Sequence, residues 1–518
     1  MYLTQGLRRS IQQTPEATAS VFQGRRRTFA ELGDRVARLA GALRGLGVQP
    51  GDRVGMLALN SDRYLEYYLG TYWAGGAVNP INTRWSVAEI AYSIDDCQTA
   101  LMLVDDNFTG MVDELRRRCP GLRAVVHVGD GAAPDGMLGY EALLAEARPV
   151  DDALRSGEDL AGVFYTGGTT GSPKGVMLSH RNLFTNSMAV VAEGAVARGC
   201  VGLHAAPMFH LADGCFMNAM LASGGCHVIV PRFEPTAVME AIQNERVEEV
   251  LLVPTMIQMV VDHPDIGRFR LGSLRNMLYG ASPISEGLLD RAMKALPAAG
   301  FTQLYGMTEL SPMATILTQE MHREAGRQLG RHRSGGRAAM GCEVRIVDAL
   351  GQEVAQGEVG EIAVRGPGVM MGYWNKPAET ASAVRDGWMF TGDGGRMDAD
   401  GYVYVVDRIK DMIVTGGENV YSAEVESVVA THPGVAACAV IGVPNDQWGE
   451  LVHVVVVRKP GAALEGQALI DHCRERIASY KCPREVSFVD AMPLSGAGKI
   501  LKTQLRAPFW AGRERKVA

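Results

Sequence analysis

Apolar and polar positions along the chain form blocks that predict helices and strands in turn. The segment TFAELGDRVARLAGALRGLG (residues 28–47) has apolar residues at helical spacing and ends at glycines. The apolar run RVGMLAL (53–59) follows, and then come the helical SDRYLEYYLGTYWAGG (61–76) and the strand-like AVNPIN (77–82). Strands separated by helices of this length predict βαβ units and a mostly parallel sheet.

The pattern changes twice toward the C-terminus. EVRIVDALGQEVAQGEVGEIAVRGP (343–367) and GYVYVVDR (401–408) read as short alternating strands with glycine-rich turns. After residue 408 the sequence becomes α+β, with a helix predicted in SAEVESVVATHP (422–433). A chain of 518 residues is also too long for one compact core. We therefore predict an α/β fold with a large N-terminal domain of βαβ-layered sheets, a small β subdomain and a smaller α+β C-terminal domain.

Composition and charge narrow the classes of protein. Apolar residues make up 47% and charged residues 21%, as in an ordinary globular protein, and the net charge of −7 argues against a nucleic-acid-binding protein. Two arginine runs, at residues 25–27 and 116–118, break the acidic trend. The first lies in a predicted hairpin and the second near a helix end, so both are interpreted as solvated faces.

The cysteines and the apolar runs bear on location. Nine cysteines are scattered without a CxxC pair, which favours a reducing cytoplasm over a disulfide framework or a zinc site. The N-terminal residues lack the apolar run of a signal peptide, and no stretch approaches a membrane span. We expect a cytoplasmic protein. Weak peripheral membrane contact and a homodimer are both compatible with the sequence.

A glycine-rich segment, YTGGTTGSPKG (165–175), follows the apolar strand DLAGVF (159–164). Glycine lets backbone N–H groups approach phosphate oxygens, while threonine hydroxyls and a lysine add donors and charge. The Walker pattern GxxxxGK[ST] is absent, because Pro173 precedes Lys174 and a glycine follows it. The residue types favour a phosphate-binding loop, but one outside the P-loop kinases and GTPases.

Five segments together resemble a known family. YTGGTTGSPKGVMLSHRNL (165–183) is similar to the signature of the acyl-adenylate-forming enzymes, which include acyl-CoA synthetases, peptide-synthetase adenylation domains and firefly-type luciferases. YGMTE (305–309), TGD (391–393), DRIKDMIVTGGENVYSAEVE (407–426) and PLSGAGKILK (493–502) follow in the family's order. The resemblance covers almost the whole chain and is closest to fatty-acid–CoA ligases.

The resemblance implies a two-step reaction. A carboxylic acid would attack ATP to give acyl-AMP and pyrophosphate, and CoA would then give acyl-CoA and AMP. It implies ATP, Mg²⁺ and CoA as cofactor and co-substrates, and a C-terminal domain that swings about a hinge. We place the N-terminal domain at 1–406, the hinge at 407–411 and the mobile C-terminal domain at 412–518.

The implied ATP site draws on the glycine-rich loop and on segments near residues 280, 305, 393 and 408. The loop would hold the β- and γ-phosphates, Tyr305 would stack on adenine, and Asp393 with Arg408 would bind the ribose. The residues so assigned are Thr166, Gly167, Gly168, Thr169, Thr170, Gly171, Ser172, Pro173, Lys174, Gly280, Ala281, Ser282, Tyr305, Gly306, Asp393 and Arg408.

Four residues would carry the chemistry by resemblance. Lys499 would stabilise the pentavalent α-phosphate, and Thr308 would add a hydroxyl to the phosphates. Glu309 would bind Mg²⁺, a hard cation that suits carboxylate oxygen. His210 would gate the passage between the acyl pocket and the thiol tunnel. Read alone, Lys499 would be a solvated charge, and His210 would be a hydrogen-bonded histidine beside a core.

The remaining assignments concern the second step and the acid. Lys410 occupies the implied hinge position, and Gly416, Gly417 and Trp448 would bind CoA. The implied acyl pocket includes Asp213, Met217 and Met307, in segments that are mostly apolar or small and lack Arg and Lys. This composition disfavours diacids and suits a medium- or long-chain fatty acid. An aryl or phenylpropanoid acid fits nearly as well.

Two rival interpretations stay open. A non-catalytic acyl-adenylate-binding sensor would use the same fold, although intact Lys499, Thr308 and Glu309 argue against it. An α/β-hydrolase would need a GxSxG nucleophile elbow, which the chain lacks. One departure falls in the loop: Gly167 stands where relatives carry serine, which removes a hydroxyl from the predicted phosphate site.

Overall fold

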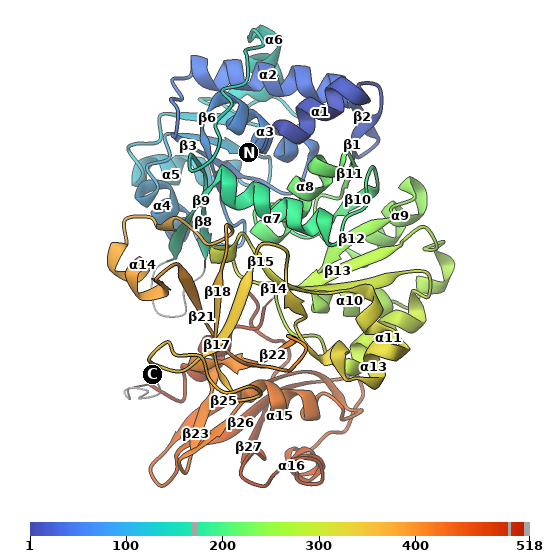
Figure 1. Ribbon diagram of the computed structural model, residues 1–518. Coiled ribbons are helices and arrows are strands. Elements are labelled where there is room, and N and C mark those ends of the chain that lie inside the picture. The colour runs from blue at the N-terminus through green and yellow to red at the C-terminus, as the bar shows by residue number, and fades with distance from the viewer. Residues whose placement is uncertain (167–172, 496–498, 512–518) are drawn as a thin grey trace.

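The computed structural model describes residues 1–166, 173–495 and 499–511. The chain forms two large sheets, a smaller sheet and a C-terminal sheet, and the C-terminal elements lie at the bottom of Figure 1, below the blue and green N-terminal elements. The predicted α/β class is confirmed, with helices layered against largely parallel sheets in the N-terminal part.

The first large sheet has eight strands in the order β19-β9-β8-β4-β3-β5-β6-β7. Its centre is parallel, whereas β9 and β19 are antiparallel. The strands are β3 (Arg53–Leu57), β4 (Ala77–Pro80), β5 (Leu101–Val104), β6 (Ala124–His127), β7 (Leu138–Gly139), β8 (Leu160–Thr166), β9 (Lys174–Ser179) and β19 (Gly372–Tyr373).

The second large sheet has nine strands in the order β16-β15-β14-β13-β12-β10-β11-β1-β2. It is parallel from β14 to β1 and antiparallel at both ends. The strands are β1 (Thr18–Phe22), β2 (Arg25–Thr28), β10 (Val201–His204), β11 (Cys226–Ile229), β12 (Glu249–Leu252), β13 (Asn276–Gly280), β14 (Gly300–Gly306), β15 (Met313–Leu317) and β16 (Arg337–Ala338).

Buried helices join the two large sheets. Helix α3 (Asp62–Ala74) contacts β3 and β4 of one sheet and β1 of the other, and all of its residues are buried. Helix α7 (His180–Ala192) contacts β8 and β9, while its partner α8 (Leu211–Ser223) contacts β10 and β11. Helix α2 (Phe29–Gly45) covers α3 and begins at a capping box, in which Thr28 and Glu31 each accept from the other's backbone N–H.

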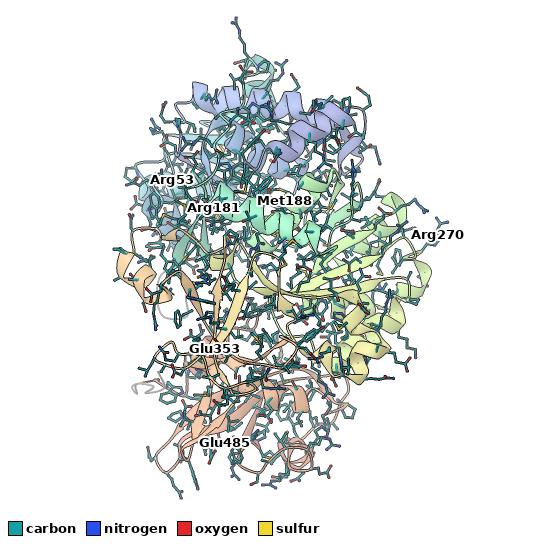
Figure 2. All side chains as sticks on the ribbon, viewed as in Figure 1. Arg53, Arg181, Met188, Arg270, Glu353 and Glu485 are labelled. Atoms are coloured by element: carbon teal, nitrogen blue, oxygen red, sulfur yellow. The ribbon has the colours of Figure 1, made fainter. Side chains whose placement is uncertain are left out.

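Further helices lie along the sheets and at their ends. Side chains fill the space between the layers, while Arg270 projects outward from the molecule (Figure 2). These helices are α1 (Gln5–Gln13), α4 (Val87–Asp96), α5 (Val112–Arg118), α6 (Tyr140–Glu146), α9 (Pro235–Glu245), α10 (Pro254–Val261), α11 (Glu286–Ala295), α12 (Gln319–His322) and α13 (Glu324–Gln328).

The third sheet corresponds to the predicted small β subdomain. It pairs β17 with β18, β18 with β21, and β21 with both β20 and β22. Its elements are β17 (Glu343–Val347), β18 (Gly360–Arg365), helix α14 (Pro377–Ala383), β20 (Val384–Arg385), β21 (Trp388–Met397) and β22 (Val403–Arg408).

The C-terminal sheet begins after a single turn, Ile409–Asp411, that separates β22 from β23. The predicted hinge, residues 407–411, comprises the last two residues of β22 and this turn, and its role as a hinge stays a prediction. The elements beyond it are β23 (Ile413–Thr415), β24 (Glu418–Val420), α15 (Ser422–Val429), β25 (Val435–Asn445), β26 (Gly449–Arg458), α16 (Gly466–Arg474), β27 (Glu485–Phe488) and α17 (Lys502–Arg506). They have a separate apolar core, centred on α15 and β26.

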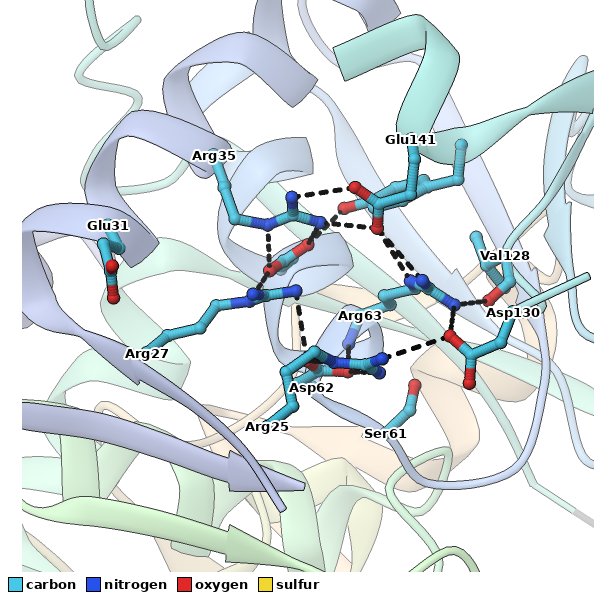
Figure 3. Close-up of polar contacts among 12 residues, drawn as sticks. Arg25, Arg27, Glu31, Arg35, Ser61, Asp62, Arg63, Val128, Asp130 and Glu141 are labelled. Carbon is cyan, nitrogen blue, oxygen red and sulfur yellow. Dashed lines mark hydrogen bonds and ion pairs between the residues drawn. The ribbon is translucent and has the colours of Figure 1, made fainter. Parts of the chain in front are cut away.

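The interpretation of the arginine run at residues 25–27 as a solvated face is wrong for two of its three members. Arg25 donates to Asp62 (2.8 Å) and Arg27 donates to Glu66 (3.0 Å), and both carboxylates are buried at the start of α3 (Figure 3). Arg35 of α2 also donates to Glu66 (2.7 Å). The hairpin sequence could not reveal these acids, which lie more than 30 residues away along the chain.

The run at residues 116–118 is solvated, as predicted. Arg117 and Arg118 pair with Glu114 on the surface of α5, and their side chains are 68% and 49% exposed. Within the described residues, no helix is long and apolar enough to cross a membrane.

Replacing Glu66 with alanine should destabilise the N-terminal region by about 3–5 kcal/mol, because Arg27 and Arg35 would keep their buried charges without this acceptor. Urea unfolding of the two proteins measures the difference. Glu114→Ala is the matched surface control and should leave the midpoint unchanged, since an exposed ion pair contributes little. Equal midpoints for Glu66→Ala and the parent protein would contradict the role of the network.

Candidate active site

The predicted phosphate loop connects two paired strands. Thr166 ends β8 and Lys174 begins β9, and the two residues face each other in the antiparallel ladder. The predicted loop residues Gly167, Gly168, Thr169, Thr170, Gly171 and Ser172 lie outside the described residues. Pro173 is buried directly before β9. Both described ends of the loop are therefore fixed by a sheet.

Aromatic side chains hold this hairpin in place. The hydroxyl of Tyr165 donates to the Asp96 carboxylate (2.6 Å), and the indole of Trp374 donates to the carbonyl of Asp96 (2.7 Å). The backbone N–H of Trp374 also donates to the Gly175 carbonyl (2.7 Å). The segment around β19 thus fastens the base of the hairpin to the end of α4.

Glu309, the predicted Mg²⁺ ligand, is buried in a short turn directly after β14. Its Oε1 accepts a hydrogen bond from the Tyr373 hydroxyl (2.9 Å). The ammonium of Lys174 lies 4.9 Å from the centre of the same tyrosine ring. Tyr373 therefore contacts both a predicted phosphate ligand and the predicted metal ligand, and the sequence analysis missed it. The only local signal is an aromatic pair, GYW, after a glycine-rich stretch.

The chemistry of this carboxylate fits a divalent cation. Burial raises the pKa of Glu309, and a backbone hydrogen bond, the Tyr373 hydroxyl and the charges of Arg408 and Lys499 provide only partial compensation. A hard cation would supply that compensation. Within the described residues, no group of three or more His, Cys, Asp or Glu side chains could hold a metal by itself. Any Mg²⁺ here would need additional oxygen ligands from water or nucleotide.

The predicted adenine and ribose residues converge on one carboxylate. Tyr305 Oη donates to Asp393 Oδ2 (2.9 Å), and Arg408 Nε lies 3.4 Å from Asp393 Oδ1. These residues come from β14, β21 and β22, so the second large sheet and the third sheet meet here.

At Gly280 and Gly306, backbone atoms of a neighbouring segment lie so close that a side chain would not fit. A Cβ at Gly306 would lie 2.0 Å from the Pro312 carbonyl oxygen, so glycine is needed immediately before the turn of Thr308 and Glu309. At the end of β13, Ala281 has a left-handed backbone (φ +65°) and precedes Ser282. A Cβ at Gly280 would likewise lie 2.2 Å from the Leu304 carbonyl oxygen, so both glycines allow neighbouring segments of the second sheet to approach closely.

Lys499 reaches this region from the C-terminal domain. It lies in a hairpin closed by the bridge between Leu494 and Ile500 and by a hydrogen bond from Ser495 N to the Lys499 carbonyl (2.7 Å). Burial, with a further effect of Arg408, lowers the pKa of Lys499 to about 8. The carboxylates of Asp393 and Glu309 act in the opposite direction, and Lys410 adds to the lowering. The ammonium is therefore placed within a partly compensated cluster of charges.

His210 is the N-cap residue of α8, where its Nδ1 accepts from the Ala212 N–H (3.2 Å). Burial, together with the charge of Lys499, lowers the pKa of His210 to about 4. The imidazole is therefore neutral near pH 7. His210 thus lies in electrostatic range of Lys499, and its role as a gate stays a prediction.

Lys410, the predicted hinge residue, is also close to this cluster. Burial, with a further effect of Arg408, lowers the pKa of Lys410 to about 8. Its carbonyl accepts from Arg506 Nη1 (3.3 Å), and Arg506 also pairs with Asp411 (2.5 Å). Helix α17 is thus fastened to the turn that follows β22.

The three predicted CoA residues lie together within the C-terminal domain. Gly416 and Gly417 form the turn between β23 and β24 with positive φ angles of 60° and 85°. The Gly416 N–H donates to the Trp448 carbonyl (2.8 Å), and a Cβ at Gly416 would lie 2.7 Å from the Trp448 ring. The indole packs against this glycine and remains 49% exposed.

Two of the predicted acyl-pocket residues lie in the interior. Asp213 is 1% exposed and pairs with His204 (2.8 Å), which in turn contacts His227 (2.9 Å). Met217 is fully buried on the same helix, whereas Met307 is partly buried against the core. The carboxylate of Asp213 belongs to a buried polar chain that the sequence did not indicate. The acyl-pocket role of all three residues stays a prediction.

Comparison with known proteins now identifies the family. The chain matches the AMP-binding enzyme family over residues 7–374 and the AMP-binding enzyme C-terminal domain over residues 424–499. It therefore belongs to the AMP-binding enzymes, as the resemblance predicted.

Three similar proteins span nearly the whole chain. It is 39% identical over 506 residues to a feruloyl-CoA synthase of Amycolatopsis sp, covering 97% of this chain and 98% of that protein. It is 36% identical over 511 residues to the medium/long-chain-fatty-acid–CoA ligase FadD8 of Mycobacterium tuberculosis, covering 95% and 87%. Among solved structures, ATP-bound MatB from Rhodopseudomonas palustris superposes with a TM-score of 0.89 at 31% identity, covering 98% and 99%.

Replacing Tyr373 with phenylalanine should weaken the binding of magnesium–ATP by about threefold to tenfold, because the hydrogen bond to Glu309 contributes ~0.5–1.5 kcal/mol. Isothermal titration calorimetry measures the affinity. Tyr402→Phe is the matched control, since its hydroxyl contacts the sulfur of Met321 (3.1 Å). Unchanged affinity in Tyr373→Phe, or the same loss in the control, would contradict the assignment.

Proposed function

We propose that the protein is an AMP-forming acid–CoA ligase, which joins a carboxylic acid to ATP as acyl-AMP and then transfers the acyl group to CoA. The observation that carries the proposal is the position of Lys499. A lysine from the C-terminal domain lies in electrostatic range of Glu309 and Asp393 of the N-terminal domain. The names of the relatives, which include feruloyl-CoA and fatty-acid–CoA ligases, support the same reaction.

In the first step, attack of a carboxylate on the α-phosphate brings two anions together, so cations must offset the developing charge. Lys499 would stabilise the α-phosphate, and Lys174 would hold the outer phosphates with the hydroxyls of Thr166 and Thr308. Glu309 would bind Mg²⁺, which neutralises phosphate charge when present. The ATP-bound structure of MatB supports nucleotide binding at this kind of site.

Tyr305, Asp393 and Arg408 would hold the nucleoside. The bond between Tyr305 and Asp393 fixes the phenol ring before ligand arrives, and Asp393 is accessible enough to accept from ribose hydroxyls. Gly280, Ala281 and Ser282 would complete the adenine slot beside Gly306. Preformed contacts of this kind reduce the entropy cost of binding.

In the second step, a thiol must reach the acyl-AMP. The C-terminal domain would rotate about Lys410, withdraw Lys499 and bring up Gly416 and Gly417, whose bare backbone suits a narrow pantetheine arm. Trp448 would contact the nucleotide of CoA with its exposed indole face. Because the His210 imidazole is neutral, it would form no ion pair with the adenylate phosphate and so would let the thiol pass.

The acid is expected to be a monocarboxylate with an apolar body. The feruloyl-CoA synthase at 39% identity supports an aryl or phenylpropanoid acid, and FadD8 at 36% supports a medium- or long-chain fatty acid. The apolar composition of residues 211–220 suits both. We place the aryl acid first on identity and keep the fatty acid predicted from the sequence as the second candidate.

A cytoplasmic location is part of the proposal. All nine cysteines lie in the described part of the chain and are free thiols, most of them buried. This state suits a reducing compartment.

Release of AMP and pyrophosphate should depend on both an acid and CoA. The panel would contain acetate, hexanoate, laurate, palmitate, benzoate, coumarate, ferulate and malonate. We expect turnover with ferulate and coumarate or with the longer fatty acids, and little with malonate. Adenylation without stimulation by CoA would indicate another acceptor. No release of AMP or pyrophosphate with any acid of the panel would favour the non-catalytic acyl-adenylate-binding sensor.

Lys499→Ala should lower acyl-AMP formation by roughly 100-fold or more, because a charge aimed at the reacting group is lost. Attack of CoA on supplied acyl-AMP should persist.

The pKa of Lys499 leads to a second prediction, on pH. The value of kcat/KM for ATP should fall as pH rises through about 8, where Lys499 of the free enzyme loses its proton.

Because the pKa of Lys410 is also lowered to about 8, the Lys410→Arg variant distinguishes the effect of one lysine on the pH profile from that of the other. This variant keeps its charge and should retain the fall above pH 8 if Lys499 is the source. Normal adenylation by Lys499→Ala would contradict the catalytic role, and a flat profile in Lys410→Arg would contradict the assignment of the titration.

A further inference from the structure

A buried polar chain connects the two sides of the turn Ile409–Asp411. Asp407 Oδ2 accepts from the Ser422 N–H (2.5 Å) and from the Ser422 hydroxyl (2.6 Å). The Ser422 hydroxyl in turn accepts from Lys502 Nζ (2.5 Å), which also pairs with Glu426 Oε1 (2.7 Å). Ser422 thus acts as donor and acceptor at once, as a hydroxyl can.

The members of this chain belong to different sheets. Asp407 lies on β22 and pairs with Gly394 of β21, so its backbone belongs to the third sheet. Ser422 and Glu426 lie on α15, and Lys502 begins α17, and both helices pack on β25 of the C-terminal sheet. Asp407 and Ser422 are 8% and 0% exposed. The contact is therefore a buried junction across the predicted hinge.

The same chain supports the hairpin that carries Lys499. Leu501 N donates to the Pro493 carbonyl (2.8 Å), which closes the base of the hairpin, and Lys502 follows directly. On the N-terminal side, Arg84 Nη1 donates to the Ser495 carbonyl (3.0 Å). The hairpin is consequently held at its base by Lys502 and near its tip by Arg84.

We propose that Asp407, Ser422 and Lys502 form a latch that holds the C-terminal domain in the arrangement that places Lys499 at the acyl-AMP-forming site. The latch rests on the proposed function, in which this domain moves between two half-reactions. In this role the three are positioning residues, because they act through the placement of Lys499.

A rotation about residues 409–411 displaces Ser422 relative to Asp407, because the two residues lie on opposite sides of the turn. Hydrogen bonds that exist in one arrangement alone shift the balance toward that arrangement. A carboxylate that accepts two hydrogen bonds in a buried place makes strong contacts of this kind. Loss of the latch should therefore lower the population that makes acyl-AMP, while the arrangement used for CoA is favoured or unchanged.

A simpler explanation is that Asp407 only accepts a hydrogen bond from a free backbone N–H in the first turn of α15 and places a negative charge at that helix N-terminus, where it is favourable. In that case its removal would loosen the C-terminal domain and affect both half-reactions alike. The ratio of the two rates therefore separates a latch from a purely structural contact.

Ser422→Pro is the sharpest variant. Ser422 is the first residue of α15, a position that accepts proline, and Tyr421 before it has the extended backbone (φ −84°, ψ 119°) that proline requires. The substitution removes both donors to Asp407 without removing a helical hydrogen bond. Asp407→Ala removes the acceptor instead and serves as the second variant.

Single-turnover acyl-AMP formation without CoA should fall about tenfold in both variants, which corresponds to ~1.4 kcal/mol. CoA attack on supplied acyl-AMP should be unchanged or faster, and it reports at the same time that the variant is folded. Glu424→Gln is the matched control: Glu424 lies on the same helix but pairs with Lys481 (2.8 Å) inside the C-terminal domain. Its ratio of rates should equal that of the parent protein.

Equal losses in both half-reactions, or unchanged acyl-AMP formation, would overturn the latch. A failure of the parent protein to use CoA would contradict the proposed ligase, and the latch would then be tested by acyl-AMP formation, which needs no CoA, together with trypsin cleavage. Limited trypsin cleavage after Arg408 or Lys410 gives a readout independent of activity. Cleavage should be faster in Ser422→Pro and Asp407→Ala than in Glu424→Gln, and equal rates would also overturn the proposal.

Discussion

The site depends on the burial of positive charge. Burial, with a further effect of the Arg408 charge, lowers the pKa of both Lys410 and Lys499 to about 8. Asp393 and Glu309 offset only part of this charge. A pocket that holds cations at such a cost is completed by an anion of high charge. A triphosphate would satisfy that requirement, and its negative charge would raise the pKa of Lys499.

The rest of the fold serves to hold these charges at fixed positions. Glu309 follows a strand of the second large sheet, Asp393 and Arg408 lie on the third, and Lys174 begins a strand of the first. No single element could bring these groups together, so the packing between sheets determines the site. The ion pairs of Asp62 and Glu66 join β2 of the second large sheet to α3, and α3 also packs on β3 and β4 of the first large sheet (Figure 3).

Much of the fold and of the candidate site could be predicted from the sequence, because both rest on local signals. Periodicity at residues 28–47 and 61–76 predicted α2 and α3, and the family motifs pointed to Lys499, Glu309 and Asp393. Tyr373, Asp96 and the partners of Arg25 could not be predicted in the same way. Each acts through a contact with a residue more than 30 positions distant, and no local pattern distinguishes such a tyrosine or arginine from an ordinary one.

The position of Lys499 also explains why a second arrangement is needed. Lys499 and the turn of Gly416 and Gly417 belong to one C-terminal domain with a common apolar core. In the present arrangement Lys499 is inserted among the charges of the N-terminal domain, while the indole of Trp448 beside Gly416 remains half exposed. A rigid domain cannot present both features to one acyl-AMP at the same time. If CoA is the acceptor, the contacts across residues 409–411 must therefore break and re-form once in each catalytic cycle, and their strength must remain low enough to permit this exchange.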